Sequence, residues 1–244
     1  MNEPDQTESN QVRPNITDKL VKPIVTYVLL GVTIVLYLAQ VLTERFLGFD
    51  LPAAFGMKIN EQILAGEYWR LLSPALLHGS LTHIAFNMYA LFVIGAELEK
   101  RFGHTRFGLL YLVGAFGGNT FSFLMSPNPS LGASTSIFAL LGAEIVFFYQ
   151  NRGVFGKGAK RALQNVISIA VINLIIGLSP GIDNYAHLGG LLAGLLFTAL
   201  AGPLLTVDGI FPNFQVVDKR PRFSLVWAVL ANVVLFSVML GFKI

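Results

Sequence analysis

A serine and a histidine stand in uncharged, apolar surroundings in this chain, and together they could perform acyl transfer. Ser134 follows a glycine-alanine pair, and His187 lies four residues after Asp183. A serine hydroxyl is a weak nucleophile until an adjacent base takes its proton, which histidine can do near neutral pH. Because Asp183 is expected to cap a helix, it is poorly placed to orient the histidine. A Ser-His dyad is therefore a better hypothesis than a triad.

The tetrahedral intermediate of acyl transfer carries an oxyanion, which needs preorganised hydrogen-bond donors. His83 and Asn87 are four residues apart, so a helix would present both on one face. The backbone N–H of Ser134 would add a donor at the positive end of a second helix. We therefore expect His83, Asn87 and the Ser134 amide to stabilise the oxyanion.

The histidines also raise the alternative of a metal site. His78, His83 and His187 all lie in apolar sequence. However, His78 and His83 are five residues apart, about 140° round a helix, which is poor for joint ligation. No acidic residue stands beside them, so the sequence predicts no metal. A lone serine can also be a cap and a lone histidine a simple hydrogen bonder, so these residues alone leave the chemistry open.

The elements that must position these residues are membrane-spanning helices. The chain has 244 residues, is 54% hydrophobic and only 13% charged, and has a mean hydropathy of +0.63. This is too little charge to cover a soluble domain of this size. Seven stretches approach the roughly 20 apolar residues that a crossing needs: 24–42, 81–96, 107–124, 133–149, 163–178, 185–205 and 223–242. We predict an all-α polytopic membrane protein, with a six-helix core and one additional C-terminal helix.

Lysine and arginine are distributed unequally between alternate connections of these spans. Thirteen of the 17 lie in one set, and the other set holds only Arg45, Lys58, Arg70 and Lys243. The positive-inside rule assigns the first set to the cytoplasm, so the N-terminus is inside and the C-terminus outside. The basic residues are thus an orientation signal rather than a nucleic-acid patch. This orientation places His83, Asn87, Ser134 and His187 at a similar shallow depth near the outer face.

Domain boundaries follow from the same pattern. Residues 1–22 are polar and mixed in charge, which predicts a disordered cytoplasmic tail without a cleaved signal peptide. Residues 23–205 form the core, 206–222 a cytoplasmic linker and 223–244 the seventh transmembrane helix.

Charged residues gather at the inner end of the second predicted span. Glu97 and Glu99 are expected to pair with Lys100, Arg101 or Arg106. His104 is expected to be a solvated loop residue.

Five short motifs lie in the predicted spans and the loops beside them: Glu67-Tyr-Trp-Arg70, His83-Ile-Ala-Phe-Asn87, Glu99-Lys-Arg-Phe-Gly103, Gly132-Ala-Ser134 and Ala186-His187-x-x-Gly190-x-x-x-Gly194. Their order, spacing and depth resemble those of the rhomboid intramembrane serine proteases, over residues 24–205. The resemblance implies a cofactor-free serine endopeptidase, with Ser134 as nucleophile and His187 as general base. It carries His83, Asn87 and the Ser134 amide over as oxyanion stabilisers.

The resemblance also implies partners and a location. The substrates would be single-span or polytopic membrane proteins, cut in or near a transmembrane segment within the lipid bilayer, and nucleic acid would not be a partner. A compact chain of this kind suits a bacterial plasma membrane, with the active site facing outside.

The resemblance also implies structural roles for residues outside the catalytic pair. Trp69 and Arg70 would belong to a half-submerged outer loop, and the fifth span would gate lateral access of substrate. Gly190 and Gly194 would let the sixth span pack tightly against the fourth, since small residues four apart permit close helix approach.

The chain departs from the family pattern at two positions. Thr135 stands where a glycine often follows the nucleophile, while Ser134 holds the Gly-x-Ser position. Phe138 replaces a tyrosine that many members place against the catalytic histidine; its ring can still stack on His187 but carries no hydroxyl.

Two other functions compete with proteolysis. A rhomboid-like protein without catalytic activity would bind membrane clients uncut, but the presence of both Ser134 and His187 argues against it. A small transporter would use Glu144, Asn119 and Asn173 as a polar path, but such folds often carry internal repeats, and none is visible.

Overall fold

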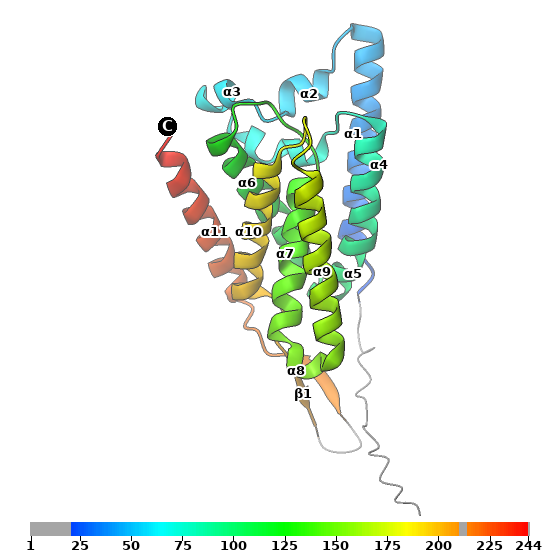
Figure 1. The fold of residues 1–244 in the computed structure, drawn as a ribbon, viewed down its shortest axis with the longest axis vertical. Coiled ribbons are helices and arrows are strands. Elements are labelled where there is room, and N and C mark those ends of the chain that lie inside the picture. Colours follow the sequence, from blue (N-terminus) through cyan, green and yellow to red (C-terminus); the bar gives the residue numbers. More distant parts are fainter. Residues whose placement is uncertain (1–20, 210–213, 244) are drawn as a thin grey trace, which may run out of the picture.

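Long apolar helices run side by side along the molecule (Figure 1). The computed structural model describes residues 21–209 and 214–243. In this part, six helices have the length and composition of membrane crossings, and α7, with 17 residues, is a shorter apolar helix. They are α1 (Ile24–Leu47), the continuous helix Leu81–Phe102, α6 (His104–Met125), α7 (Ser134–Gln150), α9 (Lys157–Ile176), α10 (Asn184–Ala201) and α11 (Ser224–Gly241). The predicted all-α polytopic fold is confirmed; residues 1–20 of the predicted tail lie outside the described residues.

The second crossing is built from three consecutive helical segments. These are α4 (Leu81–Ala90), the π-helical turn η3 (Leu91–Gly95) and α5 (Ala96–Phe102). Its start is capped, because the Ser80 hydroxyl accepts a hydrogen bond from the His83 N–H at 3.2 Å. Phe86 and Tyr89 on α4 are strongly exposed. This N-terminal half of the crossing therefore presents large apolar side chains to lipid.

Small residues let α6, α7 and α10 pack backbone against backbone at the centre of the bundle. A β-carbon added at Gly194 would lie 2.0 Å from the Ala139 carbonyl oxygen. One added at Gly114 would lie 2.4 Å from the Ala139 β-carbon. By contrast, α1 and α9 leave most of their residues exposed. The helix that begins at Ser134 is thus enclosed by its neighbours, whereas α1 and α9 face lipid.

The long connection between α1 and α4 is a structured cap over one end of the bundle (Figure 1). It contains α2 (Leu51–Gly56), α3 (Asn60–Leu64) and two 3₁₀ turns, η1 (Tyr68–Leu71) and η2 (Ser73–Leu76). Asn119 of α6 donates its side-chain N–H to the Leu71 carbonyl at 3.1 Å, which attaches the cap to the core.

The opposite end of the bundle carries the short helix α8 (Arg152–Phe155) and a β-hairpin (Figure 1). Strands β1 (Leu205–Asp208) and β2 (Gln215–Asp218) are antiparallel, with Leu205 opposite Asp218. Arg106 of α6 pairs with Asp218 at 2.5 Å. The described parts of the segment predicted to be a cytoplasmic linker, 206–209 and 214–222, thus contain most of a hairpin that is joined to α6. Four-residue strands carry too few residues for their alternation to stand out in the sequence.

Two expectations at the C-terminal end of the second crossing are wrong. Glu97 pairs with its basic neighbours as expected, but the fully buried Glu99 does not. Its carboxylate accepts hydrogen bonds from the backbone N–H groups of Val25 (2.9 Å) and Thr26 (2.7 Å) and from His104 Nδ1 (2.6 Å). His104 is thus a partner of Glu99 rather than a free loop residue. The positive N-terminus of α1 stabilises this buried charge, where a lysine or arginine partner was predicted.

Candidate active site

A tight turn brings the chain to Ser134, the first residue of α7. Gly132 adopts a φ of +143°, which a residue with a side chain rarely adopts. A β-carbon at Gly132 would also lie 2.8 Å from the imidazole Nε2 of His83. The Gly132 backbone N–H donates to the Pro74 carbonyl at 2.9 Å, so a hydrogen bond joins the turn to the cap. Only glycine allows the turn and the His83 ring to lie this close together.

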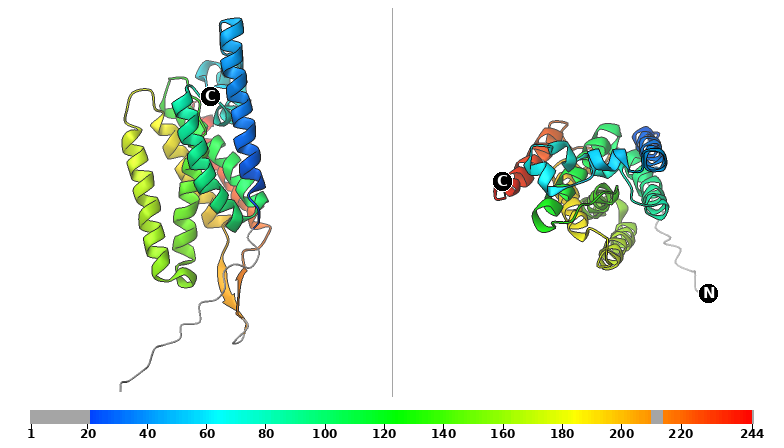
Figure 2. Two further views of the ribbon diagram at one scale, coloured as in Figure 1. Left: turned by 90° about the vertical axis from the view of Figure 1, so that its right-hand side faces the viewer. Right: turned by 90° about the horizontal axis from the view of Figure 1, so that it is seen from above.

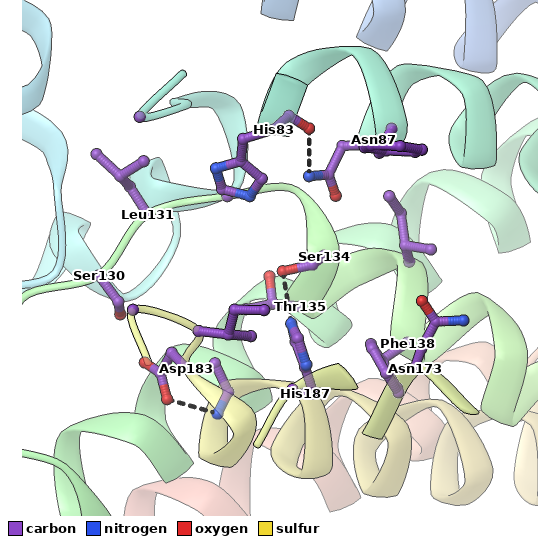
Figure 3. Close-up of a pocket in the computed structure, with 18 of the residues that line it drawn as sticks. His83, Asn87, Ser130, Leu131, Ser134, Thr135, Phe138, Asn173, Asp183 and His187 are labelled. Carbon is purple, nitrogen blue, oxygen red and sulfur yellow. Dashed lines mark hydrogen bonds between the residues drawn. The ribbon is translucent and has the colours of Figure 1, made fainter. Parts of the chain in front are cut away.

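His187 lies in the first turn of α10 and meets Ser134 directly (Figure 3). Its Nε2 is 2.9 Å from the Ser134 hydroxyl oxygen. The Phe138 ring stacks on the imidazole, with 4.4 Å between centroids and 13° between planes. The structure thus brings together the nucleophile, base and stacking ring named from the sequence.

Among the described residues, no carboxylate orients the other nitrogen of His187. Its Nδ1 is buried without a hydrogen-bond partner among the described residues. Asp183 instead caps α10, because it accepts the Ala186 N–H at 3.1 Å and also the Ser122 hydroxyl. The geometry is that of a dyad.

Close approach of α7 and α10 makes this contact possible. A β-carbon at Gly190 would lie 2.0 Å from the Thr135 carbonyl oxygen, one helical turn from His187. Gly190 and Gly194 are both buried between the two helices. Any larger residue there would push His187 away from Ser134.

His83 and Asn87 reach the site from α4 and line the same cavity as Ser134 (Figure 3). The Asn87 side-chain N–H donates to the His83 carbonyl at 2.9 Å. Among the described residues, the two side chains share a cavity with Ser134 but make no hydrogen bond to it.

His78 is a site residue whose role the sequence did not reveal. It is buried, and its Nε2 accepts a hydrogen bond from the Ala133 N–H at 3.5 Å. Burial, assisted by the nearby His83, lowers the pKa of His78 to about 3, so the ring stays a neutral acceptor. It supports the turn before Ser134 through a contact between residues 55 positions apart, for which spacing in the sequence offers no signal.

The histidines were also candidates for a metal site. His78 and His83 pack edge to face, with 4.9 Å between ring centroids. Within residues 21–209 and 214–243, no group of three or more His, Asp or Glu side chains is placed to hold a metal ion.

A cavity of about 1020 Å³ contains the site. Phe86 and Ile94 of the second crossing form one wall, and Ile169 and Ile176 of α9 form another. These apolar residues belong to two helices that face lipid, so a hydrophobic chain segment could reach Ser134 from between them.

Trp69 and Arg70 stabilise the cap and do not line this cavity. Arg70 is 3% exposed and donates to the carbonyls of Met57 (2.8 Å) and Ala54 (2.9 Å). The Trp69 indole stacks on Phe55 and donates to its carbonyl at 3.1 Å. Both residues therefore fix the short helices of the cap to one another.

A family model, that of the Rhomboid domain, matches residues 65–204. The chain belongs to the rhomboid family. It is 38% identical over 182 residues to rhomboid protease GluP of Bacillus subtilis, covering 74% of this chain and 35% of that protein. It is 42% identical over 189 residues to RHOMBOID-like protein 5 of Arabidopsis thaliana, covering 73% and 61%. RHOMBOID-like protein 4 of the same plant is 35% identical over 195 residues, covering 77% and 48%.

The rhomboid match contains the whole candidate site. Ser134, His187, His83 and Asn87 all lie within the matched residues, whereas α1 and α11 lie outside them. The chain spans about a third to three fifths of the length of these curated relatives.

Proposed function

We propose that this rhomboid is an intramembrane serine endopeptidase that hydrolyses peptide bonds in or near transmembrane segments of membrane proteins. The observation that carries the proposal is the 2.9 Å contact between the Ser134 hydroxyl and His187 Nε2 at the wall of a cavity between lipid-facing helices. A hydroxyl and an imidazole in this arrangement are a nucleophile and its base.

In the acylation step, Ser134 Oγ attacks the scissile carbonyl carbon while His187 Nε2 takes the hydroxyl proton. The oxyanion is stabilised by the Ser134 N–H, His83 and the Asn87 amide. His187 then returns the proton to the leaving nitrogen, the C–N bond breaks, and an ester on Ser134 remains. Phe138 holds the imidazole plane during both transfers.

The substrate is a single-span or polytopic membrane protein that approaches through the bilayer. Its segment enters between α4 and α9, the helices that form the apolar walls of the cavity. Following the distribution of lysine and arginine, the site opens toward the outer face of a bacterial plasma membrane.

Two single substitutions test this proposal in liposomes that contain a model single-span substrate. Ser134→Ala and His187→Ala should each abolish cleavage, and Ser134→Ala should also abolish labelling by a fluorophosphonate. Ser136→Ala is the matched control, because its hydroxyl donates to the Tyr111 carbonyl and lies outside the cavity lining. Cleavage that persists in either dyad variant would refute the proposal.

The client-binding alternative predicts a different result. The parent chain would then retain a single-span protein in the bilayer without cutting it, and Ser134→Ala would leave this binding unchanged.

A further inference from the structure

Glu144 is a carboxylic acid inside the apolar helix α7. It stands ten residues after Ser134, about 15 Å further along the helix. Among the described residues, its carboxyl group has no hydrogen-bond or ion-pair partner. An ionisable side chain within a membrane crossing is costly to leave unpaired, and it normally has a partner or a function. The described part of the chain does not supply that partner.

The cation nearest in its effect on Glu144 is already paired. Arg101 of α5 attracts the Glu144 carboxylate, but its guanidinium donates to Glu97 at 2.7 Å. The same guanidinium lies over the Phe148 ring, 5.4 Å from the centroid. Glu97 adds a second negative charge, which repels the Glu144 carboxylate. Glu144 is therefore not one half of an internal salt bridge.

Glu144 continues the face of α7 that lines the cavity. Ile137 and Leu141 belong to the cavity wall, and Glu144 follows them by seven and three residues, which places it on their side of the helix. The two flanking walls, with Ile94 on the second crossing and Ile169 on α9, hardly contact each other. Glu144 is half-buried, and neither carboxyl oxygen is fully enclosed. Its carboxyl group is thus accessible one turn beyond the cavity, toward α8.

We infer that Glu144 binds a hydrogen-bond donor in the transmembrane segment of the substrate, an inference that rests on the proposed function. A segment that enters between the second crossing and α9, with its scissile bond at Ser134, continues past Glu144 toward the opposite face. The side-chain amide of glutamine or asparagine fits this position, because it donates to a carboxylate and also pairs with a protonated carboxyl group. A wholly apolar segment leaves the Glu144 carboxyl group unpaired. Glu144 is a specificity-determining residue.

The distance between Ser134 and Glu144 sets where the donor lies in the substrate. About 15 Å corresponds to about ten residues of helix or about five residues of extended chain. A single glutamine is therefore moved through a leucine-rich single-span substrate, from about four to about twelve residues from the scissile bond. At one position, kcat/KM in liposomes should exceed that of the leucine substrate by about three- to tenfold, the usual contribution of a hydrogen bond between membrane helices.

Three variants assign this preference to the carboxyl group. Glu144→Leu should remove it, while the leucine substrate is cleaved at least as fast as by the parent and fluorophosphonate labels Ser134 at an unchanged rate. Glu144→Gln, which still accepts a hydrogen bond, should keep part of the preference. Val146→Leu is the matched control, because it places the same residue about 200° round the helix, and it should keep all of the preference.

Other results would overturn the inference. These are the absence of a preference at every position of the scan, a preference of equal size in the parent and Glu144→Leu, or an equal loss of cleavage of both substrates together with slower labelling in Glu144→Leu. The last result would show a structural role.

A binding measurement separates the inference from the proposed function. If the parent shows no cleavage that depends on Ser134, the proposed function fails. Energy transfer between labelled Ser134→Ala protein and the two substrates in liposomes needs no cleavage. Tighter binding of the glutamine substrate, lost when Glu144→Leu is added, would support the inference, and equal binding of the two substrates would refute it.

Discussion

Lys58 places a cation at the buried junction between the cap and the segment that leads to Ser134. Its Nζ donates to the carbonyls of Ser126 (3.0 Å) and Asn128 (2.7 Å), and its backbone forms a bridge with Ser130. Burial lowers the pKa of Lys58 from its ordinary 10.5 to about 8, although Asp183 counteracts part of this effect. One residue thus joins cap and site through both backbone and side chain.

Protonation of Lys58 should make the stability of the protein depend on pH. Between pH 8 and 10.5 the unfolded chain holds this proton and the folded chain has released it, so stability should rise with pH across that window. The gain is at most about 3.5 kcal/mol, from roughly 1.4 kcal/mol per pH unit between pH 8 and 10.5, and partial hydration reduces it. Thermal unfolding of the parent and of Lys58→Met in detergent at pH 7.5 and 10 measures it. The unfolding temperature of the parent, relative to that of Lys58→Met, should be higher at pH 10 than at pH 7.5. An equal change of unfolding temperature with pH in the two proteins would contradict the prediction.

At the scale of elements, the α7–α10 contact sets the geometry of the site. Gly190→Ala would place a β-carbon 2.0 Å from the Thr135 carbonyl oxygen, which a backbone atom cannot avoid by rotating. We expect a loss of about 1–3 kcal/mol from overpacking and at least a tenfold lower cleavage rate as His187 moves from Ser134. Gly31→Ala on α1 is the control, since nothing lies within 4 Å of its added β-carbon. Similar unfolding temperatures for the two variants would refute this account.

The start of α1 is hydrogen-bonded to Glu99, at the C-terminal end of the second crossing. Glu99→Gln keeps the side-chain shape but removes the charge that accepts from the Val25 and Thr26 N–H groups and from the Thr26 hydroxyl. Because hydrogen bonds to charged groups contribute more than neutral ones, we expect a loss of about 2–4 kcal/mol in unfolding free energy. Glu97→Gln, which breaks only the partly exposed ion pairs with Lys100 and Arg101, should cost less than about 1 kcal/mol. Denaturant unfolding gives the unfolding free energy of each variant. A loss in Glu99→Gln no larger than that in Glu97→Gln would contradict the prediction.

Local patterns account for the helices and for part of the site. Hydropathy alone predicts the seven long helices, and residue type with charge asymmetry puts Ser134 and His187 on parallel helices at one depth. The contact of His78 with Ala133 and that of Glu99 with α1 could not be predicted, because each joins distant residues through backbone N–H groups that have no signature in the sequence.

For the whole molecule, the two ends of the bundle differ in construction (Figures 1 and 2). The cap and the C-terminal end of α11 lie at one end, and the hairpin lies at the other. Of the four cations assigned to the outer side, Lys58, Arg70 and Lys243 all donate to backbone carbonyls, the last to Phe123 and Leu124 at the end of α6. These cations have structural roles. Arg152 and Arg220, at the other end, also donate to backbone carbonyls. Without these five residues the split of lysine and arginine between the two sets is 11 to 1, so the charge asymmetry remains.

That asymmetry predicts the orientation of the chain in the membrane. The sequence has no cysteine, so a single introduced thiol reports one position. Gln62 on α3 and Lys160 near the start of α9 are both exposed, at opposite ends of the bundle. In intact cells, a membrane-impermeant maleimide should label Gln62→Cys and spare Lys160→Cys until the membrane is opened, because the positive-inside rule retains the basic end in the cytoplasm. The reverse pattern would place the Ser134–His187 cavity on the cytoplasmic side.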